Sequence, residues 1–199
     1  MGRTTQQSKK YICYVDGGCY NNGAEDAEGY GSYSIYLLHP QQQQQQQSQQ
    51  PPQQHNPYAF TPNPNDRMHE IQILKERINP NDPKHRANLT LIHNNARFPI
   101  FPHEGKMSNN IAELVSLKVL IRKLENKRIL LKNQETPSVV IYMDSKLTIN
   151  QYTGMWQVKN SILRDIHAEL RYIIEQASIQ KSFIIGWIPN ELMKDVLGH

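Results

Sequence analysis

The amino-acid sequence predicts an α/β protein built on a mixed five-stranded sheet, with helices on both faces. Five short segments are rich in β-branched and aromatic residues, and two long segments repeat apolar residues at three- and four-residue steps. The segments follow the order βββαβαβα, counting the two helices between the last two strands as one connection. Three strands in a meander, followed by strands alternating with helices, favour a mixed sheet.

The first half of the chain supplies three of the strands. Residues 11–15 (YICYV) form an apolar run, and we expect Asp16-Gly17-Gly18 to stop it. A turn-rich stretch then leads to a second strand at 31–38, which can return antiparallel to the first. The third strand is expected at 87–93.

A low-complexity insert at about 39–88, rich in Gln, Pro and Asn, interrupts this half. Residues 39–66 have too few apolar groups to offset the entropy of ordering, so we expect disorder there. At 68–78 a short helix and an unstructured segment remain equal alternatives. Otherwise we expect a flexible N-terminus at 1–10 and a single domain at 11–199.

The second half carries the helices. Amphipathic spacing predicts helices at 110–127 and 160–176, and a shorter one follows at 145–152. Residues 138–143 are apolar on both alternating faces, as in a central strand. A last strand at 182–187 precedes a helix that begins at 191. Trp156 and Trp187 are expected in the core.

Composition limits the classes of partner and compartment. The formal charge of +4 and the pI of about 9.0 are compatible with a polyanionic partner but do not require one. Two cysteines without a CxxC pair indicate a reducing, intracellular compartment, with cytoplasm and nucleus both open. The polar N-terminus lacks the apolar core of a signal peptide, so secretion is not expected. No apolar run is long enough to span a membrane.

Three acidic residues stand where strands and helices begin or end. Asp16 follows the first strand, Glu113 lies in the first turn of the first long helix, and Asp144 follows the central strand. Each has a purely structural alternative. Asp16-Gly17 is ordinary turn chemistry, Glu113 has capping-box spacing from Asn110, and Asp144 can cap the next helix.

Together the three acids favour a metal site. If the first and fourth strands are neighbours, Asp16 and Asp144 emerge at one edge, and a helix start can place Glu113 between them. Three close carboxylates repel one another unless divalent cations neutralise them, and hard oxygen ligands favour Mg²⁺ or Mn²⁺. Two such ions can activate water and stabilise the leaving oxygen in phosphodiester hydrolysis.

The sequence resembles the catalytic domain of the ribonuclease H type 1 family. The resemblance spans residue 11 to the C-terminus without the insert, and it rests on ordered motifs. These motifs are YVDGGCYNNG at 14–23, SNNIAEL at 108–114, YMDSKL at 142–147, GMW at 154–156 and WIP at 187–189.

The resemblance implies a function and a set of site residues. It implies endonucleolytic hydrolysis of the RNA strand of RNA–DNA hybrids, with Asp16, Glu113 and Asp144 holding two Mg²⁺ ions, for which Mn²⁺ can substitute. It also implies a ribonuclease H-like fold and contacts between the hybrid and several residues near the scissile phosphate. The expected contact residues are Gly17, Gly18, Cys19, Asn22, Asn109, Asn110 and Ser145.

Some of these contact residues have structural alternatives. Gly17 and Gly18 lack a Cβ, so a nucleic-acid strand can approach their backbone. Asn22 is otherwise a turn residue. Ser145 can meet a phosphate of the DNA strand at a helix N-terminus, or it can cap its own helix.

The final helix departs from the family pattern. The family carries a fourth carboxylate there and a histidine in the preceding loop, and this chain lacks both at the matching positions. Asp195 is the candidate substitute for the acid, and the alternative is a solvated surface carboxylate. Besides an active ribonuclease H, we therefore keep two alternatives: an impaired hybrid-binding protein of the same fold, and another nuclease of the superfamily. A monomer is expected.

Overall fold

The computed structural model describes residues 9–39, 78–101, 106–130, 132 and 138–198. The expected disorder at 39–66 and the possible helix at 68–78 lie almost wholly outside these residues. The strands are β1 (Lys10–Tyr20), β2 (Glu28–Leu38), β3 (Leu89–Ile100), β4 (Val139–Met143) and β5 (Phe183–Trp187). The helices are α1 (Pro83–Arg86), α2 (Asn109–Asn126), α3 (Lys146–Tyr152), α4 (Ser161–Gln176) and α5 (Asn190–Leu197).

The five strands form one mixed sheet in the order β3-β2-β1-β4-β5. β1 pairs antiparallel with β2, and β2 with β3, whereas β1 with β4 and β4 with β5 are parallel. The predicted fold class is confirmed, including the adjacency of the first and fourth strands. β4 lies between two parallel neighbours and is fully buried, as its apolar sequence predicts.

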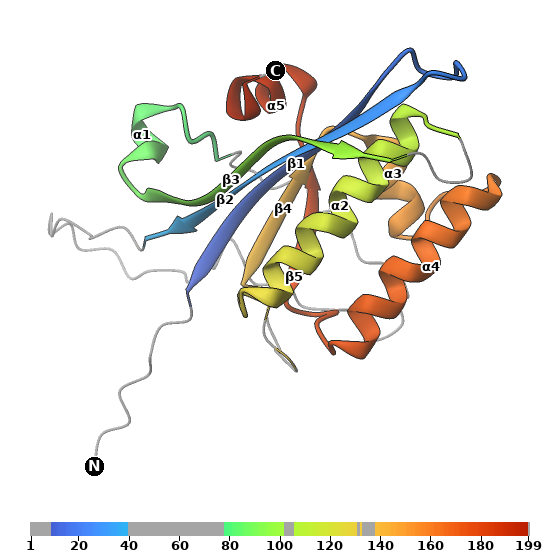
Figure 1. Cartoon of the computed structure of the whole chain (residues 1–199). Helices are drawn as coiled ribbons and strands as arrows, with labels where there is room; N and C mark the ends of the chain where they lie inside the picture. The colour runs from blue at the N-terminus through green and yellow to red at the C-terminus, as the bar shows by residue number, and fades with distance from the viewer. Residues whose placement is uncertain (1–8, 40–77, 102–105, 131, 133–137, 199) are drawn as a thin grey trace, which may run out of the picture.

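Helices cover the two faces of the sheet unequally (Figure 1). The larger core cluster joins α2, α3 and α4 to one face through residues such as Leu117, Leu120 and Leu170. The smaller cluster joins α5 to the other face, where Met193 is buried against Tyr14 and Tyr142. α5 is short, so it shields only part of its face.

β1 is longer than predicted. It does not stop at Asp16-Gly17-Gly18 but continues to Tyr20, because β2 pairs with it along its whole length. The expectation for Trp156 was also wrong, since its side chain is 51% exposed. Trp187 is only partly buried, against the larger core.

The end of the expected insert is structured. Ile78 is buried beside α5, and its carbonyl accepts a hydrogen bond from the Tyr14 hydroxyl. The amides of Asn79 and Asn81 bond to Asp195 on α5. Residues 78–88 therefore belong to the domain, and the insert is shorter on this side than the sequence suggested.

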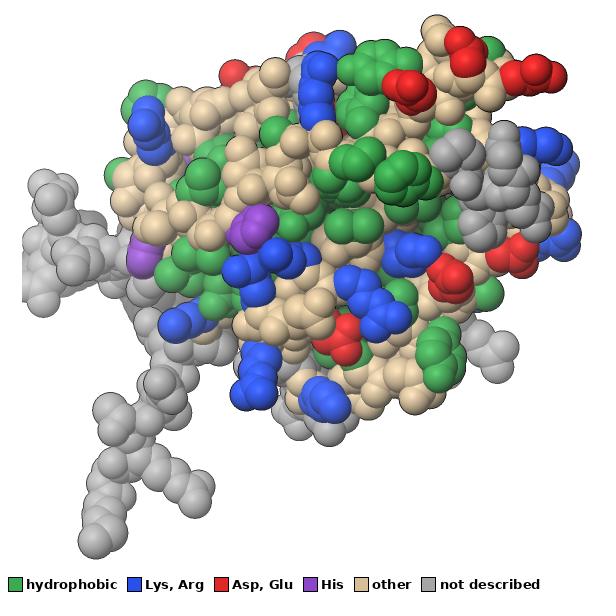
Figure 2. All heavy atoms as spheres, in the orientation of Figure 1, with side chains coloured by type: hydrophobic (Ala, Val, Ile, Leu, Met, Phe, Trp, Pro, Cys, Tyr) green, Lys and Arg blue, Asp and Glu red, His purple; other side chains and the backbone are tan. Residues whose placement is uncertain are grey.

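The helical face of the molecule carries mixed charge (Figure 2). Lys118 on α2 pairs with Glu169 on α4 at 2.5 Å, and Arg122 pairs with Glu125 at 3.6 Å. These local partners are typical of a solvated helix surface. Within the described residues, no helix is long and apolar enough to cross a membrane.

Candidate metal centre

Three carboxylates from three different elements meet beside the end of β4. Asp16 on β1, Glu113 on α2 and Asp144 after β4 each offer an oxygen, and these oxygens all lie within 4.8 Å of one another. The residues predicted from the sequence as ligands are thus brought together.

The parallel pairing of β1 and β4 aligns the two aspartates. Tyr14 is opposite Tyr142 in the register, and two positions further along, Asp16 and Asp144 project to the same face. Glu113 arrives from the other side, because α2 packs closely on β1 at Gly17. A Cβ at Gly17 would come closer than 3.0 Å to the backbone of Ala112, so glycine permits this approach.

The structure excludes the three structural alternatives for these acids. Asp16 lies inside a strand and not in a turn. Ser108 is the N-cap of α2, so Glu113 is too far into the helix to form a capping box. Ser145 is the N-cap of α3, so Asp144 does not cap it. None of the three carboxylates is used to terminate an element.

Burial and mutual repulsion raise the pKa of two of the three carboxyl groups, Glu113 and Asp144. Burial raises the pKa of Glu113 well above its usual value, and Asp16 and Asp144 add to the effect by repulsion. Burial, with repulsion from Asp16, raises the pKa of Asp144 to about 6. Clustered like charges in a partly desolvated site produce such shifts.

The cluster fits a divalent cation. Oε2 of Glu113 and Oδ1 of Asp144 are buried and have no hydrogen-bond donor among the described residues. A buried carboxylate oxygen without a donor is costly unless a cation or a proton neutralises it. An all-carboxylate set is the donor chemistry that hard cations such as Mg²⁺ prefer.

Trp187 and Lys194 modify the surroundings of Asp144. The Trp187 indole donates to the Asp144 carbonyl at 2.9 Å, and the Lys146 ammonium lies 4.3 Å from the centre of the Trp187 ring. These contacts hold the backbone that carries Asp144. Lys194 of α5 lowers the Asp144 pKa, against the larger effect of burial, so the last helix presents positive charge to the site.

Asp195 is not part of the cluster. Its carboxylate accepts a hydrogen bond from the Asn79 amide at 3.1 Å, on the side of α5 that faces residues 79–81. Within the described residues, only Asp16, Glu113 and Asp144 form a metal-binding group. The buried Met193 fixes the rotation of α5, so that Asp195 faces residues 79–81 while the charge of Lys194 acts on Asp144.

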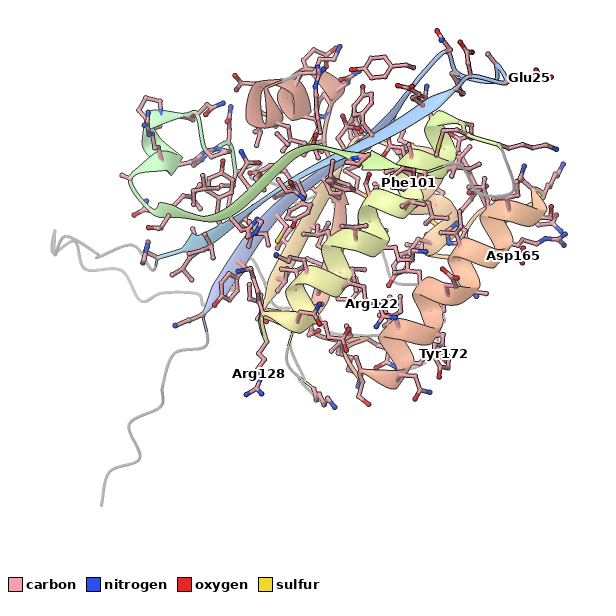
Figure 3. The ribbon with its side chains drawn as sticks, in the orientation of Figure 1. Glu25, Phe101, Arg122, Arg128, Asp165 and Tyr172 are labelled. Atoms are coloured by element: carbon pink, nitrogen blue, oxygen red, sulfur yellow. The ribbon has the colours of Figure 1, made fainter. Side chains whose placement is uncertain are left out.

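The expected substrate-contact residues surround the three acids. Gly17, Gly18 and Cys19 continue β1 beyond Asp16. The Asn22 side chain accepts a hydrogen bond from the Asn109 backbone at 3.2 Å, which ties the β1–β2 turn to the start of α2. Glu25 marks this turn in Figure 3.

The remaining two expected contact residues, Asn110 and Ser145, differ in their hydrogen bonds and exposure. Asn110 is exposed in the first turn of α2. The Ser145 hydroxyl donates to the Thr148 hydroxyl at 3.0 Å and accepts from the Thr148 backbone. Ser145 therefore caps its own helix, which was its structural alternative, and its contact with a phosphate remains a prediction.

Sequence reasoning missed three residues near the site: Tyr30, Trp187 as a support of Asp144, and Lys194. Tyr30 is recognised only from the β1–β2 register, in which Gly18 lies opposite it and leaves space for its ring. Trp187 and Lys194 act through contacts between distant segments, which no local pattern reveals.

Solved structures of ribonuclease H are similar to this chain. Ribonuclease H1 of the archaeon Halobacterium salinarum has a TM-score of 0.51 and 13% identity, covering 94% of this chain and 91% of its own. The N-terminal ribonuclease H domain of rv2228c from Mycobacterium tuberculosis has a TM-score of 0.48 and 15% identity, covering 94% and 92%. No protein-family model matches the sequence, and no curated protein matches it either.

The chain therefore has the ribonuclease H fold, with the same mixed sheet. At 13% identity, this likeness establishes the fold alone.

Proposed function

We propose that this protein is a divalent-metal-dependent endonuclease that hydrolyses the RNA strand of RNA–DNA hybrids. The observation that carries the proposal is the convergence of Asp16, Glu113 and Asp144 within 4.8 Å on a ribonuclease H fold. Fold alone does not specify chemistry, so the argument depends on the site. The carboxylates come from the positions that the sequence motifs single out.

Each acid has a distinct task in this proposal. Asp16 and Asp144, on neighbouring strands, form the rigid part of the ligand set. Glu113 closes it from α2, and because burial raises the pKa of Glu113, protons and a cation compete for this carboxylate. Trp187 keeps Asp144 in place through the bond to its carbonyl. When bound, the metal supplies activation of the attacking water and stabilisation of the leaving oxygen.

We propose Mg²⁺ as the metal, with Mn²⁺ as a substitute, and two ions as the working stoichiometry. Support for the metal class comes from the all-oxygen donor set. A second ion needs a further ligand, whereas the α5 residue whose charge acts on Asp144 is Lys194, which is positively charged. Titration calorimetry with Mg²⁺ counts the ions directly.

The hybrid is proposed to lie across the β1 end and the start of α2. Gly18 and Cys19 are partly exposed there, and Asn109 and Asn110 are exposed in the first turn of α2. A helix N-terminus suits the phosphates of a nucleic-acid strand. The 2′-hydroxyl is the group by which such a site distinguishes RNA from DNA.

The test is a strand-labelled cleavage assay with Mg²⁺ and an RNA–DNA hybrid. We expect internal cuts in the RNA strand alone, and a loss of activity of about a hundred- to a thousandfold in Asp16→Asn and Asp144→Asn, the scale of a lost electrostatic contribution. Asp165→Asn is the matched control, because Asp165 is an exposed carboxylate on α4, away from the cluster (Figure 3). A wild-type protein that leaves the hybrid intact with Mg²⁺ and Mn²⁺ would refute the proposal.

One observation favours a second candidate, a hybrid-binding protein with impaired catalysis. The last helix directs Lys194 toward the site, while Asp195 is engaged by Asn79. This candidate predicts salt-sensitive hybrid binding without turnover. A third outcome, cleavage from strand ends or of DNA, would indicate another nuclease activity on the same fold.

We also propose an intracellular, monomeric protein. Cys13 and Cys19 are both free, as a reducing compartment would leave them. Fractionation of cells and light scattering of the purified chain test the two statements separately.

A further inference from the structure

An aromatic and basic cluster lies beside the metal centre on the open part of the sheet. It consists of Tyr20 on β1, Tyr30 on β2 and Arg97 on β3. The rings of Tyr20 and Tyr30 are 5.0 Å apart, and the Arg97 guanidinium lies 5.6 Å from the Tyr30 ring centre. Its Nη1 donates to the Tyr20 hydroxyl at 2.9 Å. We call these three residues the Arg97 cluster.

The Arg97 cluster shares its face with the carboxylates. Tyr30 is opposite Gly18 in the β1–β2 register, and a Cβ at Gly18 would come closer than 3.0 Å to the Tyr30 hydroxyl. Ser32 is opposite Asp16 and accepts the Arg97 backbone N–H at 2.9 Å. Side chains directly opposite each other in an antiparallel pair project to one face. Asp16 and Glu113 both act electrostatically on Tyr30, as expected of near neighbours.

An irregularity in β3 presents Arg97 to this face. The β2–β3 register shifts between Gly31 and Tyr33, and Arg97 adopts a left-handed backbone with φ of 51°. A bulge re-aims side chains, and a non-glycine residue with positive φ persists only where its surroundings enforce it. Here the enforcing contact is the bond from the Arg97 backbone to Ser32.

Most N–H donors of the Arg97 guanidinium have no acceptor among the described residues. It is exposed, and among the described residues no carboxylate lies within ion-pair distance of it. Its one side-chain hydrogen bond there is the one to Tyr20, whereas a guanidinium carries five N–H donors. A cation held in place without an acidic partner, beside a site for a phosphodiester, is arranged to receive an external anion.

We infer that Arg97, held by Tyr20 and Tyr30, binds a phosphate of the RNA strand next to the scissile phosphate. This rests on the proposed function, which places the scissile phosphate at the carboxylates. Tyr20, which holds the guanidinium, lies four residues beyond Asp16 on β1, about 13 Å along the strand, so Arg97 meets a neighbouring phosphate and not the reacting one. In the proposed function the RNA strand is the one cut at the metal centre. The same strand continues over β1 and β2, so the phosphate that reaches Arg97 belongs to the RNA.

The variant Arg97→Asn tests this contact, because Asn tolerates the left-handed backbone. Arg128→Asn is the matched control: Arg128 is also an exposed arginine with positive φ, at the far end of α2 (Figure 3). Hybrid binding is measured in an Asp144→Asn background, so that the substrate is not consumed. We expect Arg97→Asn to weaken binding about tenfold and to lower the slope of log K against log salt by about one, and Arg128→Asn to change neither.

Neutral methylphosphonates, placed one at a time in each strand, locate the phosphate. In the Asp144→Asn background, binding by the chain that keeps Arg97 should weaken at one position of the RNA strand beside the cut, and the chain that also carries Arg97→Asn should be insensitive at that position. An unchanged salt slope, or a sensitive position only on the DNA strand, would overturn the inference. Cleavage by the otherwise wild-type chain is assayed in parallel, so a failure of the proposed function is recognised separately.

Discussion

The two halves of one sheet face have opposite characters. Along β1, Ile12 and Tyr14 are buried under α5 and Ile78, whereas Asp16 and Gly18 are partly exposed and Tyr20 is 48% exposed. These residues alternate on the same side of one strand. The covered half is apolar, and the open half carries a carboxylate, a glycine and a polar aromatic ring.

The difference follows from the shortness of the final helix. α5 covers the sheet only as far as the carboxylates, so the same strands form a hydrophobic core under α5 and a candidate site beyond it. The carboxylates remain partly exposed, which lets a cation and a substrate enter, yet the neighbouring core desolvates them enough to raise the pKa of Glu113 and Asp144.

The largest expected effect comes from loosening the covered half. Met193 is 1% exposed under the sheet, so Met193→Ala should lower the free energy of unfolding by about 2–5 kcal/mol. Met155→Ala is the matched control, because Met155 is 53% exposed and its loss should cost less than about 0.5 kcal/mol. Urea unfolding measures both. Equal losses in the two variants would show that α5 does not anchor this half.

Removing the Tyr14 hydroxyl from the covered half should affect stability, and removing the Tyr20 hydroxyl from the open half should affect hybrid binding. Tyr14→Phe leaves the buried Ile78 carbonyl without its donor and should cost about 1–3 kcal/mol of unfolding free energy. Tyr20→Phe should cost less than about 0.5 kcal/mol, since the hydroxyl is exposed, but should weaken hybrid binding by releasing Arg97. Urea unfolding and hybrid titration are run on both. A Tyr20→Phe variant that loses stability and not affinity contradicts the division.

The open half should respond to pH and metal. Because the Asp144 pKa is raised from 3.8 to about 6, the folded chain binds more protons than the unfolded chain between these values. This group's contribution to metal-free stability therefore falls as pH rises through that window. Mg²⁺ competes with the proton, so the increase in Tm on adding Mg²⁺ should be larger at pH 7.5 than at pH 5. Asp144→Asn should lose much of both responses, and a pH-independent increase would argue against carboxylate ligation.

The smallest expected effect concerns Lys194. Its ammonium opposes a cation near Asp144, so Lys194→Ala should strengthen Mg²⁺ binding by about two- to fivefold, the usual worth of an exposed charge. Lys159→Ala, which removes an exposed lysine from the loop before α4, serves as the control. Calorimetry at matched ionic strength measures both. Weaker binding in Lys194→Ala would mean that this lysine supports the site.

Local sequence was enough to predict the three clustered acids, but it could not show whether Asp195 joins them. Asp16 and Asp144 follow apolar runs, and Glu113 lies near the start of an amphipathic segment, so their places depend on patterns within a few residues. Asp195 depended on the rotation of α5. Asn79, which engages it, lies 116 positions away along the chain. No periodicity carries that information.

The sequence by itself determined the order of the elements, the mixed sheet and the positions of Asp16, Glu113 and Asp144, because propensity and apolar spacing act over short distances. Only the tertiary structure decided how far β1 extends, which half of its face α5 covers, and which way Arg97 and Lys194 project. These features depend on packing between segments far apart in the chain. Burial, which raises the pKa of the carboxylates, likewise exists only once those segments have assembled.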